Sequence, residues 1–343
     1  APVDFGLAAT LSLLLFIAIA VALLVQAGIL RSRSFQVISG RTRPARTIDL
    51  RFWRWPAFIL CVVIFLLALV VPLGMCVLLS FLHAFGLGIT PGNFTLDNYT
   101  AVFTSSSNDL AALTRTIWLA FGTASVTALI GLPLAFIIRR TTLPGRRLLS
   151  LFTLVTIAVP GIILACGYIF AWNATYLENI GIGGVNGIKF YGTLWILFAA
   201  YIGGSLPYAT RLGIGALEQV GQNMLDAARV QGARTFQLLA RIVAPLLRAN
   251  LISVWLLVFT GTMFELAASE LLYPPGQPTL PVQIVGYFNN FQLGPGMALA
   301  MLDVALVTLF LIVLRAIPWL FQRLVKFGAR RRMNYVSTDS ATH

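Results

Sequence analysis

The chain has 343 residues, of which 58% are hydrophobic and only 10% are charged, and its mean hydropathy is +0.87. Soluble domains carry about 25% charged residues, so this composition excludes a soluble enzyme, a disordered tail and a secreted disulfide scaffold. The net charge of +13 would suggest a nucleic-acid partner for a soluble protein. In an integral membrane protein, the positions of the charges must be considered first.

The apolar residues are gathered into long segments. About 20 apolar residues are needed for a helix to cross a bilayer, and the alternation typical of a membrane β-barrel is absent from runs such as FILCVVIFLLALVVPL. The sequence therefore predicts an all-α integral membrane protein with about seven transmembrane helices. These segments are Phe5–Leu30, Pro56–Leu82, Thr116–Ile138, Leu148–Ala171, Tyr191–Thr210, Asn250–Leu272 and Met297–Phe321.

The basic residues alternate between the two sides of these spans. Of the 24 Lys and Arg residues, 21 fall in the linker after the first span, in the loops after the third and fifth spans, and in the C-terminal tail. Only Arg115 and Lys189 fall on the opposite side, and Arg315 lies near the end of the last span. Because basic loops stay in the cytoplasm, the N-terminus is predicted outside and the C-terminus inside. The net charge is thus explained by topology, and no nucleic-acid partner is expected.

No cofactor or metal site is predicted in this chain. Cys61, Cys76 and Cys166 lie within apolar runs without the spacing of metal ligands. The phosphate-binding pattern G-x-x-x-x-G-K-[ST] is absent, so this chain is not expected to hydrolyse ATP by that chemistry.

A long polar loop, residues 211–249, separates the fifth and sixth spans. The pattern predicts a helix over roughly Leu217–Gln231 that ends at Gly232, the usual residue type after a helix. A second, amphipathic helix is predicted from Thr235, with Pro245 bending the chain before the next span. Its apolar face would consist of Phe236, Leu239, Val243 and Leu246.

The loop resembles the EAA loop of ABC importer permeases, which reads EAA, three residues, G, nine residues, I-x-L-P. The matching residues are Asp226, Ala227, Ala228, Gly232, Ile242 and Pro245. Every spacing agrees, while Asp226 replaces Glu and Ala244 replaces Leu. The alternative is an ordinary helical hairpin closed by a glycine.

The similarity covers about Leu50 to Phe321 and includes TLDNYTAVF and FELAASELLYPPGQPTLPVQI, which look like permeases of the ferric-iron type. The resemblance implies a six-span type I importer permease domain at 56–321, with its EAA-like loop at 211–249. Residues 1–55 look like the last helix and basic linker of a preceding permease half, and 322–343 form a basic tail. The chain therefore resembles the second half of a fused two-half permease.

The resemblance also implies function and partners. The chain is expected to be a permease subunit of the bacterial inner membrane, not an enzyme, and to pass solute delivered by an external binding protein. A cytoplasmic ATPase dimer with its own ATP and magnesium would dock on the loop, and a second permease half and membrane lipid are the other partners. Ferric iron is the first candidate solute; thiamine, polyamine and aminoethylphosphonate stay open.

Ionisable and helix-breaking residues within spans are candidates for the translocation pathway. Glu265 and Glu270 are placed in the sixth span, Asp303 in the seventh, and Pro160 and Gly161 in the fourth. The carboxylates would attract a cation, or each would cap a broken helix or pair with a neighbouring span. Pro160-Gly161 would be a hinge or a static kink.

Two other classes compete with the importer permease. The carboxylates in the sixth and seventh spans are compatible with an ion-coupled secondary transporter or channel, which would work without an ATPase. A membrane-embedded enzyme would need a convergent cluster of catalytic side chains. With His83 and His343 as the only histidines, that reading has little support.

Overall fold

A computed structural model describes residues 49–104, 108–173 and 190–314, with residue 316 and a few separate positions between 10 and 25. The predicted first span, most of the following linker and the tail lie outside the described residues. Across the described part, the chain forms helices and turns, with one isolated bridge between Leu82 and Phe94 and no strand.

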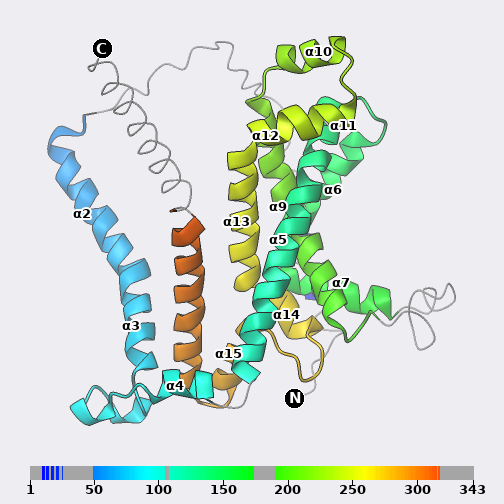
Figure 1. Cartoon of the computed structure of the whole chain (residues 1–343). Coiled ribbons are helices and arrows are strands. Elements are labelled where there is room, and N and C mark those ends of the chain that lie inside the picture. Colours follow the sequence, from blue (N-terminus) through cyan, green and yellow to red (C-terminus); the bar gives the residue numbers. More distant parts are fainter. Residues whose placement is uncertain are drawn as a thin grey trace, which may run out of the picture.

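The helices follow one another with short connections (Figure 1). Their bounds are η1 Arg51–Trp53, α2 Arg54–Phe65, η2 Leu66–Val70, α3 Val71–Ser80, η3 Phe85–Leu87, η4 Pro91–Asn93, α4 Asp97–Thr104, α5 Asn108–Arg140, α6 Arg146–Ala158, α7 Gly161–Trp172, α9 Leu194–Glu218, α10 Gln222–Val230, α11 Thr235–Leu238, η5 Leu239–Val243, α12 Ala244–Leu246, α13 Arg248–Met263, α14 Ala267–Leu272 and α15 Leu280–Asn289, followed by the final helix Leu293–Leu314.

Three continuous helices are long and apolar enough to cross a membrane: Arg51–Ser80, Asn108–Arg140 and Leu293–Leu314. Two bent helix pairs raise the number to five if each pair is one span. In addition, α9 has 25 residues, but its middle carries the polar and helix-weakening run GGSLPY. It packs against α5, α6, α7, α13 and α14, although Trp195, Tyr208 and Leu212 on its surface are exposed.

Two predicted continuous spans are broken. Leu148–Ala171 divides into α6 and α7, whose axes differ by 114°, because Val159 is extended and Pro160 has no backbone N–H to continue the helix. Asn250–Leu272 divides into α13 and α14, so Glu265 lies in the break between them. Both predicted spans are therefore interrupted, the first at the Pro160-Gly161 pair where a hinge or kink was expected.

The centre of the bundle depends on close contact between α5 and α9. A Cβ atom added at Gly131 would lie 2.9 Å from the Cβ of Ala209, and one added at Gly213 would lie 2.9 Å from the Cβ of Ala135. Small residues let two helix backbones approach in this way, as is common between membrane helices. The final helix joins this core through Val307, which is buried with residues of α5 and α13.

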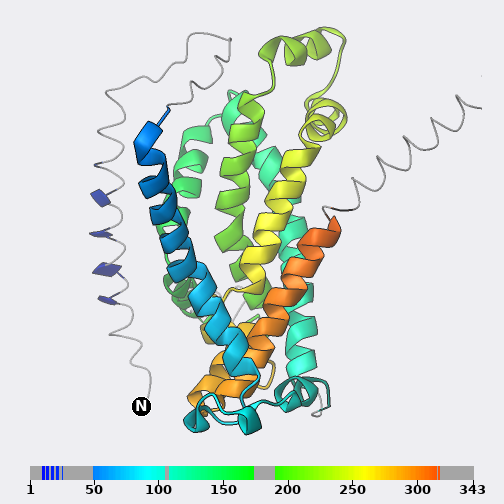
Figure 2. The same ribbon diagram turned by 90° about the vertical axis from the view of Figure 1, so that its left-hand side faces the viewer.

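The α2–α3 helix stands away from the bundle (Figures 1 and 2). None of its most apolar 18-residue window is buried. Its lower end in Figure 1 is tied to the following segment, because Ser80 and Tyr99 share a hydrogen bond of 2.7 Å and the Asn98 side chain donates to the carbonyl oxygens of Ser80 and Leu82 at 2.9 Å.

Candidate functional site

The polar loop predicted from the sequence forms one end of the bundle, hereafter the loop end. There α10, α11, η5 and α12 connect α9 to α13 (Figure 1). The first predicted helix begins later than expected: Leu217 still belongs to α9, and α10 starts at Gln222 after the extended residue Gly221. The second helix begins at Thr235, as predicted. An 80° bend separates Thr235–Leu246 from α13, at the place where Pro245 was expected to bend the chain.

Gly232 forms the turn between the two loop helices. Its φ is +84°, a conformation that glycine adopts without steric cost. The N–H of Gly232 donates to the carbonyl oxygen of Arg229 at 2.9 Å, and the N–H of Ala233 donates to that of Ala228 at 3.0 Å. These bonds satisfy the last carbonyl groups of α10. A Cβ at Gly232 would meet no atom within 4 Å, so backbone conformation rather than crowding favours glycine here.

The other motif residues lie around this turn. Asp226 is exposed and accepts hydrogen bonds from the side chains of Arg229, at 3.0 Å, and Gln222, at 3.3 Å. Ala227 and Pro245 are exposed, whereas Ala228 and Ile242 are half-buried. The loop therefore presents Asp226 and Ala227 to its surroundings.

The loop packs on the bundle through part of the predicted apolar face, namely Val243 and the half-buried Leu239. Leu225, Leu238 and Val243 are fully buried in a cluster with residues of α5 and α9. Phe236, by contrast, belongs to the predicted apolar face but is 78% exposed, and Val230 is 89% exposed. These two apolar side chains lie on either side of Gly232 in the sequence and remain uncovered.

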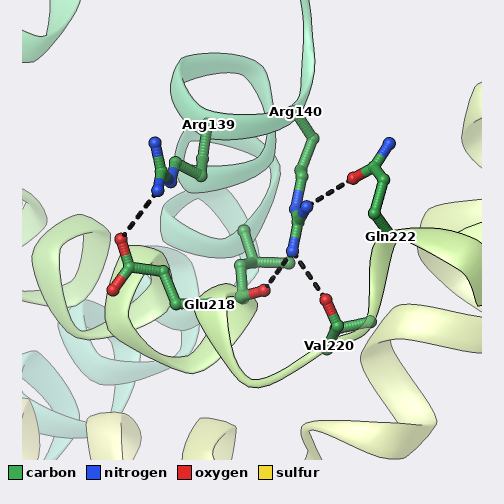
Figure 3. Close-up of polar contacts among 6 residues, drawn as sticks. Arg139, Arg140, Glu218, Val220 and Gln222 are labelled. Carbon is green, nitrogen blue, oxygen red and sulfur yellow. Dashed lines mark hydrogen bonds and ion pairs between the residues drawn. The ribbon is translucent and has the colours of Figure 1, made fainter. Parts of the chain in front are cut away.

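Arg140, at the end of α5, holds the start of this loop (Figure 3). Its guanidinium donates to the carbonyl oxygens of Leu217 at 2.6 Å and Val220 at 2.7 Å, and also to the side-chain oxygen of Gln222. It thereby joins α5, the last turn of α9 and the first residue of α10. Charge-assisted hydrogen bonds of this kind are stronger than neutral ones. Sequence reasoning had treated Arg140 only as a topology signal.

A cavity of about 320 Å³ lies between the two helix breaks. It is bounded by the end of α6, the start of α7, the middle of α9, and the α13–α14 break. Its polar lining side chains are Thr156, Tyr201, Ser205, Tyr208, Thr262 and Glu265. No Lys, Arg or His lines it among the described residues. The tyrosines of α9 were not predicted, although the polar run GGSLPY in an otherwise apolar segment marks their position.

Glu265 connects the two breaks. One of its carboxylate oxygens accepts the backbone N–H of Ala268 at 3.0 Å, which caps α14. The same oxygen would lie 3.1 Å from a Cβ at Gly161, so the glycine at the start of α7 allows close approach. Tyr201 shares a hydrogen bond with Ser269, whose hydroxyl also donates to the carbonyl oxygen of Glu265. The carboxylate is therefore both a helix cap and part of the cavity wall.

The remaining pathway candidates lie in other positions. Pro160 is the residue immediately before α7, directly at the first break. Glu270 is exposed, and Asp303 is buried in the final helix with one carboxylate oxygen lacking a hydrogen-bond partner in the described part of the chain. Neither of these two carboxylates lines the cavity. The structure thus brings together Glu265 and the Pro160-Gly161 break, but not the other two acidic residues.

Comparisons with known proteins agree with this arrangement. The family described as "Binding-protein-dependent transport system inner membrane component" matches residues 127–326. A Salmonella choleraesuis protein, PhnV, whose name assigns it to a 2-aminoethylphosphonate transport system permease, is 26% identical over 79% of this chain and 97% of its own length. The ferric transport system permease FbpB of Actinobacillus pleuropneumoniae is 25% identical over 91% of this chain, which covers 43% of FbpB.

The fold also has a counterpart among solved structures. A chain of a bacterial alginate ABC transporter, solved in complex with an alginate-bound periplasmic protein, matches with a TM-score of 0.60. The match covers 77% of this chain and 93% of that one, at 16% sequence identity.

Proposed function

We propose that this chain passes a solute bearing positive charge, with ferric iron as the first candidate. The chain belongs to the family of binding-protein-dependent transport system inner membrane components and is a multi-pass ABC importer permease. The family assignment places translocation, rather than catalysis, in this subunit. It also favours ATP-driven transport over the ion-coupled transporter considered from the spans alone.

The charge of the cavity carries the proposal. Glu265 is its one ionisable carboxylate, and the other polar groups around it are hydroxyls. A carboxylate in a partly buried site attracts a cation more strongly than it would in water. Phosphate and phosphonate groups, by contrast, are usually held by Arg or Lys, and no such residue lines this cavity.

The solutes named for the relatives differ in how fully they suit this cavity. The name of FbpB specifies ferric transport, whereas that of PhnV specifies an aminoethylphosphonate. Glu265 suits the ferric ion, or the ammonium group of the second solute, but offers nothing to a phosphonate. Thiamine, polyamines and aminoethylphosphonate also carry a positively charged group and remain the alternatives to iron.

The loop end is the proposed docking surface for a separate ATPase. Asp226, Ala227, Val230 and Phe236 are exposed around the turn at Gly232, and uncovered apolar groups beside polar ones are typical of a protein interface. An external binding protein would dock at the opposite end, and a second permease half would complete the pathway. The greater length of FbpB supports that second half, since this chain covers 43% of it.

The same loop is continuous with the helices that line the cavity. Its two ends pass into α9 and α13, and both helices contribute to the cavity wall. A displacement of the loop by the ATPase would therefore move both helices and change access to Glu265. Rigid-body movement of packed helices is an established means of such switching.

Substitution of the two neighbouring glutamates tests the proposal. In cells carrying the whole transport system, Glu265→Gln should lower uptake of radiolabelled ferric iron about tenfold, because it removes the negative charge and keeps the side-chain shape. The matched control is Glu270→Gln, an exposed carboxylate five residues away, which should leave uptake within about twofold of wild type. Equal uptake by both variants would contradict a cation site at Glu265.

A further inference from the structure

A second cavity, of about 370 Å³, lies at the loop end between α5, α6 and α9. It is separate from the cavity at Glu265 and shares no lining residue with it. Its wall consists of Ile138, Arg139, Arg146, Arg147, Ser150, Arg211, Ile214 and Glu218. Its volume falls within the range of small-ligand sites.

Four guanidinium groups and a single carboxylate line this cavity. Arg139 pairs with Glu218 at 3.2 Å. Arg211 donates to the carbonyl oxygen of Ser150 at 2.7 Å, and Arg146 donates to that of Thr141. In the described part of the chain, no carboxylate lies within ion-pair distance of Arg146, Arg147 or Arg211. Three positive charges therefore remain without a negative partner around one hollow.

The first turn of α6 adds to this positive potential. The helix begins at Arg146, has 13 residues and has no side-chain cap at its N-terminus. The free N–H groups and dipole of a helix N-terminus favour an anion. In addition, the Nε of Arg211 is buried and has no hydrogen-bond partner among the residues that the structure describes.

The general excess of basic residues on one side of a membrane protein explains why arginines occur at this end. It does not explain why arginines from three segments, at 139, 146–147 and 211, converge on one cavity. Like charges brought together repel one another, and a bound anion would offset that repulsion.

We propose that this arginine-lined cavity binds a phosphate group, presented by an anionic lipid headgroup or by free phosphate. Arginine is well suited to phosphate because its planar guanidinium can donate two parallel hydrogen bonds. The cavity lies at the ends of the predicted spans, and basic pockets between membrane helices at this depth can hold lipid headgroups. A phosphate here would join α5, α6 and α9 close to the loop that contacts the ATPase.

The test compares two double variants of the full chain purified in a neutral detergent. Thermal stability is titrated with short-chain phosphatidylglycerol, with phosphatidylcholine and with inorganic phosphate. Arg146→Gln/Arg147→Gln removes two cavity charges. The matched control, Arg51→Gln/Arg54→Gln, removes two arginines on the same predicted side that do not line the cavity. Arg147→Gln alone is included because Arg147 is exposed and its side chain has no ion-pair partner among the described residues.

If the cavity binds phosphate, phosphatidylglycerol or inorganic phosphate should stabilise the wild type and the Arg51→Gln/Arg54→Gln control at the same half-saturating concentration. That concentration should rise about fivefold in Arg147→Gln and about 25-fold in the cavity double variant, since each basic residue near an anionic surface contributes about fivefold. Stabilisation by phosphatidylglycerol alone identifies a lipid headgroup, and stabilisation by phosphate identifies a soluble anion. The proposal would be overturned if both double variants showed the same rise in half-saturating concentration. It would also be overturned if phosphatidylcholine and phosphatidylglycerol stabilised the protein equally while phosphate had no effect.

Discussion

The guanidinium of Arg140 lies 2.7 Å from the carbonyl oxygen of Val220, a residue 80 positions later in the chain. This contact links the end of α5 to the start of the loop on which the ATPase is proposed to act (Figure 3). Because Val220 is itself buried against α5 and α9, the hydrogen bond and the apolar packing hold the loop in the same place. The loop can therefore transmit movement to the bundle rather than swing independently.

Removal of this contact should loosen the loop. Arg140→Gln loses hydrogen bonds to Leu217, Val220 and Gln222, and hydrogen bonds to charged groups contribute about 1.5–3 kcal/mol each. We expect a net destabilisation of about 2–4 kcal/mol, less than the sum of three such bonds because water and the glutamine side chain replace part of them. Proteolysis between residues 219 and 233 should be faster, and transport should fall about tenfold or more. Arg140→Lys should recover little of the lost stability and transport, because an ammonium group cannot span the same acceptors.

The matched control is the adjacent residue. Arg139→Gln breaks an ion pair with Glu218 in which both side chains are 55% exposed, and such exposed pairs contribute about 0–1 kcal/mol. Its proteolysis and transport should stay within about twofold of wild type. Equal effects at both positions would show that the charge of this region, and not the hydrogen bonds of Arg140, determines the result.

The contact between α5 and α9 gives a prediction about packing. Gly131→Ala would place a Cβ 2.9 Å from that of Ala209, and overpacking of this kind costs about 1–3 kcal/mol. Gly215→Ala is the control, because its Cβ would meet no atom within 4 Å and alanine has the higher helix propensity. Thermal unfolding in detergent should show a lower midpoint for the first variant and an unchanged or higher one for the second. A higher unfolding midpoint for Gly131→Ala than for Gly215→Ala would rule out the close approach of α5 and α9.

The turn at Gly232 gives a prediction about backbone conformation. Since a Cβ there meets open space, substitution should cost only the energy of a positive φ, about 1 kcal/mol for alanine. Asparagine tolerates this conformation better than alanine, so Gly232→Asn should be the more stable of the two. Hydrogen exchange of the amides of residues 231–233 measures the difference. Equal exchange in both variants would indicate that the turn changes conformation on substitution.

Local sequence patterns predicted the features that depend on neighbouring residues. A helix stop at Gly232 and a helix start at Thr235 follow from a glycine and a short polar turn; in the structure α10 ends at Val230, Gly232 forms the turn with positive φ, and α11 starts at Thr235. The break at Pro160 was visible as a weak point, because proline cannot donate the helical hydrogen bond. Its 114° bend could not be predicted, since that angle depends on how α7 packs against α9 and α14.

Features that join distant segments could not be predicted. Arg140 contacts acceptors 77 to 82 residues away, and basic residues at a helix end usually only indicate topology. Likewise, a helix cap was one of the roles considered for Glu265, but no local signal in this apolar run identified Ala268 as the residue whose N–H it accepts. Periodicity gave an apolar face that includes Phe236 and Val243, but it could not show that Leu238 is also buried against residues of α5 and α9 while Phe236 stays exposed.

The most direct test of the account is uptake of radiolabelled ferric iron by cells carrying the complete transport system, with wild type and Gly232→Asp compared in the presence and absence of ATP depletion. The account predicts ATP-dependent uptake by the wild type and at least a tenfold loss in Gly232→Asp, with the variant still inserted in the membrane, because aspartate adds a charge at the turn proposed to face the ATPase. Uptake by Gly232→Asp at the wild-type rate, or wild-type uptake that survives ATP depletion, would contradict it.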